Sequence, residues 1–230
     1  MKNETMIDKE RSVLGVAVNT DSHAKACELQ LPKNPILYFK TPNTLVAHEA
    51  PVQKPDQVSF YTPQAELVVV IGEVIHRIEK EQAMEAVSGY TILNNFTAQE
   101  WVRGYYRPPV KAKNFDGSGA LGPLVVAAEQ IADPHDLAVT TKVNGEVISN
   151  DSTASYVHRI EEVIYWAASF LTLYPGDMIA MGCVSQLTPV NAGDVVEVTI
   201  DGIGTLRNTL VSEQQFYATE SVAEETIAEL

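Results

Sequence analysis

The sequence has little cysteine, little positive charge and no long apolar run. These features mark disulfide-stabilised, nucleic-acid-binding and membrane-spanning proteins, respectively. Its only two cysteines, Cys27 and Cys183, are too few for a disulfide-stabilised scaffold and are typical of a reducing compartment. The 16 lysine and arginine residues face 30 aspartate and glutamate residues, and the net charge of −14 disfavours binding to a phosphate backbone. No apolar run approaches the roughly 20 residues of a membrane-spanning helix. We therefore expect neither nucleic acid nor a membrane as a partner.

The remaining bulk properties are those of an ordinary globular protein. The 230 residues are enough for one large domain or two small ones. Residues 1–11 are charged and lack the apolar core of a signal peptide, so we expect a cytoplasmic protein. The acidic balance still permits a small anionic substrate, because a local group of lysines and arginines can set the field inside a cleft.

One stretch, residues 60–72, organises the rest of the chain. Leu67–Ile71 is a run of five apolar residues, β-branched apart from the leucine and stopped by a glycine, which predicts a buried strand. Gln64 and Glu66 lie two apart at its entrance and so point to the same face. This pair is a candidate site for a metal ion or a substrate. The alternative is a strand entrance with two solvated polar side chains.

Short strands joined by turns dominate the remaining pattern. Expected strands cover residues 12–18, 35–40, 90–95, 178–181, 195–200 and 204–210, with a hairpin over 137–148 that turns at Asn144 and Gly145. Expected helices cover 79–87, one or two turns of 97–103, and 156–171 with a cap from 151–153; residues 19–29 form a short helix or a mobile loop. The long helix must cover one sheet face to bury its apolar stripe. The pattern predicts one α+β domain with a large, mostly antiparallel, rolled or closed sheet.

Positive charge is concentrated in one segment, residues 103–117. It holds Arg103, Arg107, Lys111 and Lys113, interleaved with Tyr105 and Tyr106. Such a cluster suits a substrate that carries a carboxylate. A solvated loop that balances nearby acidic residues is an equal alternative.

Several stretches in order resemble the fumarylacetoacetate hydrolase family. They are Glu66–Gly72, Gly89–Asn95, Lys113–Asp116 with Leu121–Pro123, Val143–Glu146 followed by Thr153, Tyr174–Asp177, Gly193–Asp194 and Gly202–Asn208. Each motif alone is weak, but so many in this order and spacing are specific. Two further stretches, Tyr105–Lys113 and Ala132–Asp136, are similar to the isomerase/decarboxylase members of the family.

The resemblance implies a fold that agrees with the strand pattern. This fold is α+β but mostly β, a mixed β-sandwich roll with a long covering helix. The implied division is residues 1–33 as an N-terminal strand and lid-like segment, 34–213 as the β-roll domain, and 214–230 as an acidic C-terminal tail.

The resemblance also implies a metal site, which this sequence has altered. Members bind Mg²⁺ or Mn²⁺ through a Glu-x-Glu pair on the central strand and an aspartate after the next strand. Glu66 matches the second glutamate, whereas Gln64 stands in place of the first and Asn95 in place of the aspartate. Amide oxygens attract a hard dication much less than carboxylates do. We therefore expect weak metal binding or none.

Other roles follow from the resemblance residue by residue. His23 falls where a lid histidine acts as base, and Glu28 is its nearby acidic helper because Ala26 occupies the usual glutamate position. Lys113 matches the family lysine that attracts the substrate oxygens. The expected substrate-binding residues are Arg103, Tyr105, Arg107, Thr153 and Gln99, the last in place of an arginine.

The implied function is an isomerase/decarboxylase-type enzyme, or a subunit of one. It would act on a small, unsaturated 2-oxo or 2-hydroxy dicarboxylic acid in aromatic-compound catabolism. Two alternatives stay open: a non-catalytic partner subunit of an intact paralogue, and a C–C hydrolase of acylpyruvate-like substrates. The family's habit of pairing domains implies a homodimer, or a heterodimer with an intact paralogue.

Overall fold

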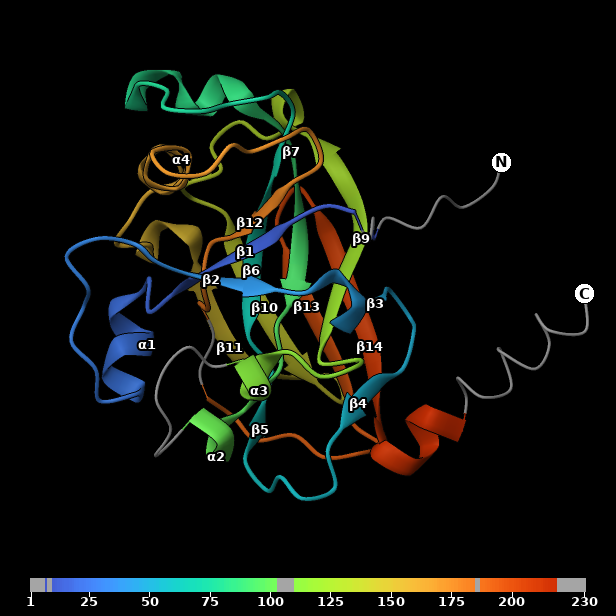
Figure 1. The fold of residues 1–230 in the computed structure, drawn as a ribbon. Coiled ribbons are helices and arrows are strands. Elements are labelled where there is room, and N and C mark those ends of the chain that lie inside the picture. Colours follow the sequence, from blue (N-terminus) through green and yellow to red (C-terminus); the bar gives the residue numbers. More distant parts are fainter. Residues whose placement is uncertain (1–6, 8–9, 103–109, 185–186, 219–230) are drawn as a thin grey trace, which may run out of the picture.

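The larger of two main sheets carries the central strand. The computed structural model describes residues 7, 10–102, 110–184 and 187–218, and within them this sheet has the strand order β2-β1-β12-β6-β7-β9-β3 (Figure 1). Its strands are β1 (Val13–Ala17), β2 (Ile36–Lys40), β3 (Leu45–Ala47), β6 (Ala65–Ile71), β7 (Val87–Asn94), β9 (Gly119–Ala127) and β12 (Met178–Ala180). Every residue of β6 is buried. The apolar run of the sequence thus lies at the middle of the sheet, as predicted.

A second sheet packs against the first. Within the same residues its strand order is β11-β10-β13-β14-β4, and a separate pair, β5-β8, completes the strands. The bounds are β4 (Val52–Lys54), β5 (Tyr61–Thr62), β8 (Thr97–Ala98), β10 (Ala138–Val143), β11 (Glu146–Ser152), β13 (Val195–Ile200) and β14 (Gly204–Ser212). Leu67 and Val69 of β6 share one apolar core with Val198 of β13 and Leu206 of β14. The main core therefore lies between the two sheets.

Helices are short and lie at the edges of these sheets. The labelled α-helices are α1 (Asp21–Ala26), α2 (Gln99–Val102), α3 (Val110–Lys113) and α4 (Ile160–Ala168), and residues 213–218 are also helical. The 3₁₀ helices are η1 (Pro42–Thr44), η2 (Lys80–Ala86), η3 (Ala128–Gln130) and η4 (Thr153–Ser155). Among the described residues, no helix is long and apolar enough to span a bilayer.

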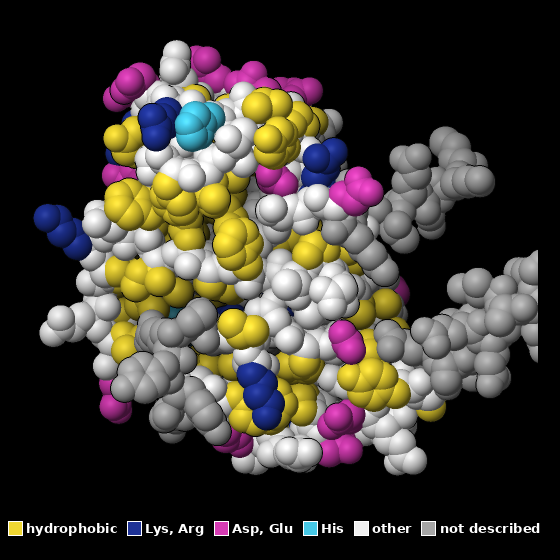
Figure 2. All heavy atoms as spheres, viewed as in Figure 1, with side chains coloured by type: hydrophobic (Ala, Val, Ile, Leu, Met, Phe, Trp, Pro, Cys, Tyr) yellow, Lys and Arg dark blue, Asp and Glu magenta, His cyan; other side chains and the backbone are white. Residues whose placement is uncertain are grey.

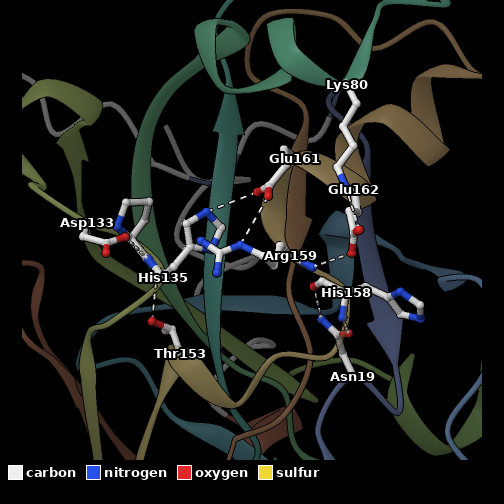
Figure 3. Close-up of polar contacts among 10 residues, drawn as sticks. Asn19, Lys80, Asp133, His135, Thr153, His158, Arg159, Glu161 and Glu162 are labelled. Atoms are coloured by element: carbon white, nitrogen blue, oxygen red, sulfur yellow. Dashed lines mark hydrogen bonds and ion pairs between the residues drawn. The ribbon is translucent and has the colours of Figure 1, made fainter.

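The predicted long helix is shorter at both ends than the sequence pattern indicated. It begins at Ile160 rather than Tyr156, because the backbone N–H of Val157 donates to Asn19 O at 2.8 Å. The Asn19 side chain then brackets His158, accepting from its N–H at 2.8 Å and donating to its carbonyl at 3.0 Å (Figure 3). Ser152, expected to cap this helix, caps η4 instead. A tertiary contact to the N-terminal segment has overridden helical propensity.

Other differences from the predicted elements are small. Residues 80–86 form a 3₁₀ helix rather than an α-helix. Five short or irregular strands, β3, β4, β5, β8 and β9, were not predicted, and β8 occupies the first two residues of the expected helical turns over 97–103. Among the strands of the described residues, three pairs are parallel, β1–β12, β3–β9 and β4–β14, and the other pairs are antiparallel. The predicted class, a mostly β protein with mixed, rolled sheets, is confirmed.

Candidate active site

The site begins where β6 and β7 pair. These strands are antiparallel, with Ala65 opposite Asn94, and the N–H of Asn95 donates to Gln64 O at 2.9 Å. The pairing brings Gln64, Glu66 and Asn95 together, although Asn95 lies about 30 residues further along the chain. Asn95 Nδ2 donates to Glu66 Oε1 at 2.9 Å. The three residues that the sequence resemblance placed at metal-ligand positions therefore form one buried group.

Lys113 enters this group from α3. Its ammonium nitrogen Nζ donates to Gln64 Oε1 at 2.5 Å and to Thr97 Oγ1 at 2.7 Å. Its backbone carbonyl accepts from the buried Lys40 Nζ at 2.5 Å, which fixes the end of the short helix. An ammonium has three N–H groups. Within the described part of the chain, the third N–H of Lys113 has no protein acceptor, so it can bind a ligand.

Burial disfavours the charged forms of both Glu66 and Lys113. Burial raises the pKa of Glu66, and the positive charge of Lys113 is the largest influence that holds it down. Burial also lowers the pKa of Lys113, and Glu66 is the largest influence that opposes this shift. Each group therefore favours the charged form of the other. The N–H of Gly182 adds a hydrogen bond to Glu66 Oε2 at 3.0 Å.

The helix α1 places His23 at the same site. Thr20 caps α1 by accepting from the His23 N–H at 3.2 Å, and His23 Nε2 lies 3.6 Å from Cys27 Sγ one turn later. Burial and, second, the charge of Lys113 lower the pKa of His23 to about 4. The imidazole is therefore neutral at physiological pH and can accept a proton.

These groups line a cavity of about 590 Å³. This volume suits a small organic acid. Most of the exposed surface inside the cavity is apolar, although about half of the lining residues carry a polar or sulfur group: His23, Cys27, Tyr38, Gln64, Glu66, Thr97, Gln99, Lys111, Lys113 and Cys183. On the face shown in Figure 2, hydrophobic side chains gather across the middle, and acidic side chains lie mainly towards the edges.

The predicted site residues divide into three sets. His23, Lys113, Gln64, Glu66 and Gln99 line the cavity, and Asn95 is bonded to Glu66 behind them. Gln99 is held by a hydrogen bond from its Nε2 to Thr62 Oγ1 at 2.9 Å. Glu28 is exposed and does not line the cavity. The predicted residues Arg103, Tyr105 and Arg107 lie outside the described residues.

Thr153 lies apart from this cavity, at the first residue of η4 in the connecting loop before α4. Its hydroxyl donates to Pro134 O at 2.9 Å (Figure 3). It also accepts from the N–H of Leu137 at 2.9 Å. Nearby, His135 Nε2 lies 3.2 Å from Glu161 Oε2. In this structure Thr153 ties the loop to the start of β10, and its part in substrate binding stays a prediction.

Tyr38 is a site residue that sequence reasoning missed. Its ring lines the cavity, and its hydroxyl accepts a hydrogen bond from Asn95 Nδ2 at 2.6 Å. Within the sequence it is one residue of an apolar strand. No local pattern distinguishes it, because its place at the site follows from the pairing of β2 with β1 and not from β2 itself.

The residues present do not fit a divalent metal. Both oxygens of Glu66 accept hydrogen bonds from N–H donors, and Gln64 Oε1 accepts from the Lys113 ammonium. Among the side-chain oxygens of these three described residues, Asn95 Oδ1 is the one that is buried without a partner. One neutral oxygen beside an ammonium is a poor ligand set for a hard dication. No described group of three His, Cys, Asp or Glu side chains is placed to hold a metal.

The pKa of His23 predicts how stability depends on pH. Its folded value of about 4 is below its ordinary value of 6.5, so the unfolded chain binds the proton more readily between these values. Stability is therefore lost as the pH falls from 6.5 towards 4. Urea unfolding of the wild type and of His23→Gln at pH 7 and pH 4.5 tests this, and the wild type should lose more stability than the variant. Parallel losses would show that His23 is not buried in its neutral form.

Comparisons with known proteins agree with this geometry. The Fumarylacetoacetate (FAA) hydrolase C-terminal family matches residues 12–211. The chain is 37% identical over 203 residues to the 4-hydroxyphenylacetate degradation bifunctional isomerase/decarboxylase of Salmonella dublin, a match that covers 88% of this chain and 47% of that protein. The chain thus spans about half the length of this curated relative.

Two solved structures are also similar. One is 5-carboxymethyl-2-hydroxymuconate delta-isomerase from Mycobacterium smegmatis, with 31% identity, a TM-score of 0.76 and coverage of 88% of this chain and 79% of that chain. The other is fumarylpyruvate hydrolase from Pseudomonas aeruginosa in complex with Mn²⁺ and pyruvate, with 28% identity, a TM-score of 0.82 and coverage of 88% and 90%. The resemblance inferred from the sequence motifs is confirmed, and the chain belongs to the fumarylacetoacetate hydrolase family.

Proposed function

We propose that this chain is an isomerase that binds a small, unsaturated 2-hydroxy or 2-oxo dicarboxylic acid and moves a proton within it without a divalent metal. The observation that carries the proposal is the position of Lys113 Nζ. It donates to Gln64 Oε1, beside Glu66 and Asn95, with one N–H left for a ligand. A buried cation therefore lies among the residues that correspond to the family's metal ligands, and it faces a cavity of suitable size.

The reaction requires only the transfer of one proton. The proton leaves the 2-hydroxyl oxygen of a dienol, the double bond shifts, and a proton is added to carbon, so atoms and electrons balance without an oxidant. The intermediate is an enolate whose charge develops on the 2-oxygen. A fixed ammonium in a cavity screened from water stabilises such a charge strongly. We propose that the Lys113 ammonium stabilises the negative charge on this 2-oxygen.

We assign the proton transfer to His23, which acts as the base. Its imidazole is neutral, lines the cavity, and has an Nδ1 atom without a partner among the described groups. The charge of Lys113 contributes to its low pKa. An anionic substrate bound at Lys113 offsets that charge and so makes His23 a stronger base when substrate is present. We propose that α1, within the segment 1–33, forms a lid over the substrate.

The substrate class comes from the relatives. One is named for 4-hydroxyphenylacetate degradation and another for isomerising 5-carboxymethyl-2-hydroxymuconate. We infer that this chain acts on the same kind of acid in aromatic catabolism, as a homodimer or together with an intact paralogue. The proposed division into residues 1–33, 34–213 and 214–230 places the cavity between the first two segments.

A second candidate is a non-catalytic subunit whose partner supplies the metal site. The observation that favours it is the ligand set, in which Glu66 remains as a carboxylate while Gln64 and Asn95 are amides. In this case the cavity would bind a ligand, and the chemistry would occur in the partner.

An assay with the purified chain separates these functions. The chain is incubated with 5-carboxymethyl-2-hydroxymuconate and excess EDTA, while the dienol absorbance and carbon dioxide release are followed together. We expect the absorbance to fall without release of carbon dioxide. Turnover only after Mn²⁺ is added would contradict the metal-free proposal, and carbon dioxide release would indicate a decarboxylase. Turnover only after an intact paralogue is added would support the non-catalytic subunit.

A further inference from the structure

The aromatic ring of Tyr38 is built into the floor of the cavity. It lies in β2 directly opposite Gly15 of β1, and a side-chain carbon at position 15 would come within 2.2 Å of Tyr38 Cζ. Glycine at position 15 therefore gives the ring room to lie across the neighbouring strand. The Lys113 ammonium lies 5.7 Å from the centre of the same ring. Tyr38 and Lys113 thus approach the cavity from different elements and meet there.

The hydrogen-bond network determines which way the Tyr38 hydroxyl can donate. Asn95 Nδ2 donates one hydrogen to Glu66 Oε1 at 2.9 Å and the other to the Tyr38 hydroxyl oxygen at 2.6 Å. This orientation of the amide follows from the carboxylate, because Asn95 Oδ1 in that place would repel Glu66 Oε1. The Tyr38 oxygen is therefore an acceptor towards Asn95, and its own O–H is directed elsewhere.

The Tyr38 O–H has no protein acceptor among the residues that the structure describes. The side chain is only 7% exposed, so bulk water does not simply replace one. Burial and the charge of Glu66 raise the pKa of Tyr38 well above its usual value, and the phenol remains a donor throughout the physiological range. Leaving a buried donor without a partner costs free energy, and a donor that lines a cavity can be satisfied by an acceptor atom of a ligand.

We propose that Tyr38 is a further catalytic residue, whose O–H and the remaining N–H of Lys113 together bind one anionic oxygen of the substrate. This inference rests on the proposed function and deepens it. The two donors would hold the 2-oxygen as it becomes an enolate, in the absence of a metal. It also explains why position 95 is an amide. An ionised aspartate cannot donate to Tyr38, so it could not direct the tyrosine O–H into the cavity.

Binding of oxalate tests the inference, because oxalate is a planar dianion that resembles the enolate of a 2-oxo acid. Isothermal titration in excess EDTA compares the wild type with Tyr38→Phe, which removes only the hydroxyl. Loss of one hydrogen bond to a charged group should weaken oxalate binding by about 10- to 100-fold. The matched control is Tyr61→Phe, since Tyr61 is buried outside the cavity and its hydroxyl has no partner among the described residues. This control should bind oxalate like the wild type.

The outcomes distinguish the inference from the function on which it rests. Weaker binding by Tyr38→Phe with an unchanged Tyr61→Phe supports both. Equal binding by the wild type and Tyr38→Phe would overturn the role of Tyr38 and leave the metal-free site intact. Failure of the wild type to bind oxalate in EDTA, with binding restored by Mn²⁺, would overturn both. Thermal unfolding of each variant confirms that the compared proteins are folded.

Discussion

Replacing Lys113 by alanine is expected to lower kcat/KM of the isomerisation by about 100- to 1,000-fold, the usual loss when one preorganised donor to an oxyanion is removed. The loss should fall mainly on kcat, because the charge on the substrate oxygen is greatest in the transition state. In the folded protein Lys113 Nζ donates to the side chains of Gln64 and Thr97. No other lysine with a described position donates to either side chain. Steady-state kinetics in EDTA measure the effect.

The Lys113→Ala protein is expected to remain folded. Removing the ammonium leaves Glu66 without its main positive neighbour, but it also removes the cost of burying a second charge. Glu66 can then take up a proton, because burial already raises its pKa. Lys113→Met keeps the volume of the aliphatic stem and separates the loss of charge from the loss of packing.

Lys25→Ala is the control for the loss of one positive charge. Lys25 lies on α1, is 77% exposed, and pairs with Asp21 away from the cavity lining. Its kinetics should match those of the wild type. Equal rates for Lys113→Ala and the wild type would remove Lys113 from the mechanism, and with it the proposal that an ammonium takes the part of a metal.

The double variant Gln64→Glu with Asn95→Asp is expected to bind Mn²⁺ at least about 100-fold more tightly than the wild type, for which we expect weak binding or none. The wild-type group holds one carboxylate, Glu66, beside the Lys113 ammonium. The variant holds three carboxylates at the same positions. Because β6 and β7 already bring these positions together, the new oxygens should converge without a change of the backbone.

The variant should also show a pH dependence of known sign. Three carboxylates crowded into a buried site raise one another's pKa, so protons compete with the metal. Mn²⁺ affinity should therefore rise as the pH rises. Isothermal titration at two pH values measures this, and Mn²⁺ should raise the melting temperature of the variant, because a ligand that binds only the folded state stabilises it.

Gln64→Glu with Asn94→Asp is the matched control. It adds the same two charges, but Asn94 Oδ1 accepts from the Gln64 backbone N–H at 3.1 Å, whereas the described hydrogen bonds of Glu66 come from Asn95 and Gly182. This control should gain little metal affinity. No gain in the Gln64→Glu, Asn95→Asp variant would mean that carboxylates at these positions do not converge as their amides do.

The central part of the site could be predicted from the sequence. The apolar run Leu67–Ile71 indicated a buried strand, and the spacing of Gln64 and Glu66 placed both at its entrance. The ordered motifs indicated the family, and with it the correspondence of Asn95 and Lys113 to family positions. The prediction of the buried strand is confirmed, because burial and alternation along one strand depend directly on the local sequence, whereas the roles of the site residues stay predictions.

Contacts between distant segments could not be predicted in the same way. The start of α4 is set by Asn19, which lies 139 residues before His158, and no helix signal reports such a contact. Thr153 matches a family position, yet its hydroxyl is bonded to Pro134 and Leu137. Tyr38 gave no signal at all, although it is bonded to Asn95 at the centre of the site.

The sequence by itself determined the family and the central strand, and it placed amides at two positions where the resemblance implies carboxylates. Only the tertiary structure decided what those amides do: Gln64 accepts from Lys113, and Asn95 donates to both Glu66 and Tyr38. The physical reason is that a residue pattern reports the environment of one segment, whereas hydrogen-bond partners depend on which segments the strand order places side by side.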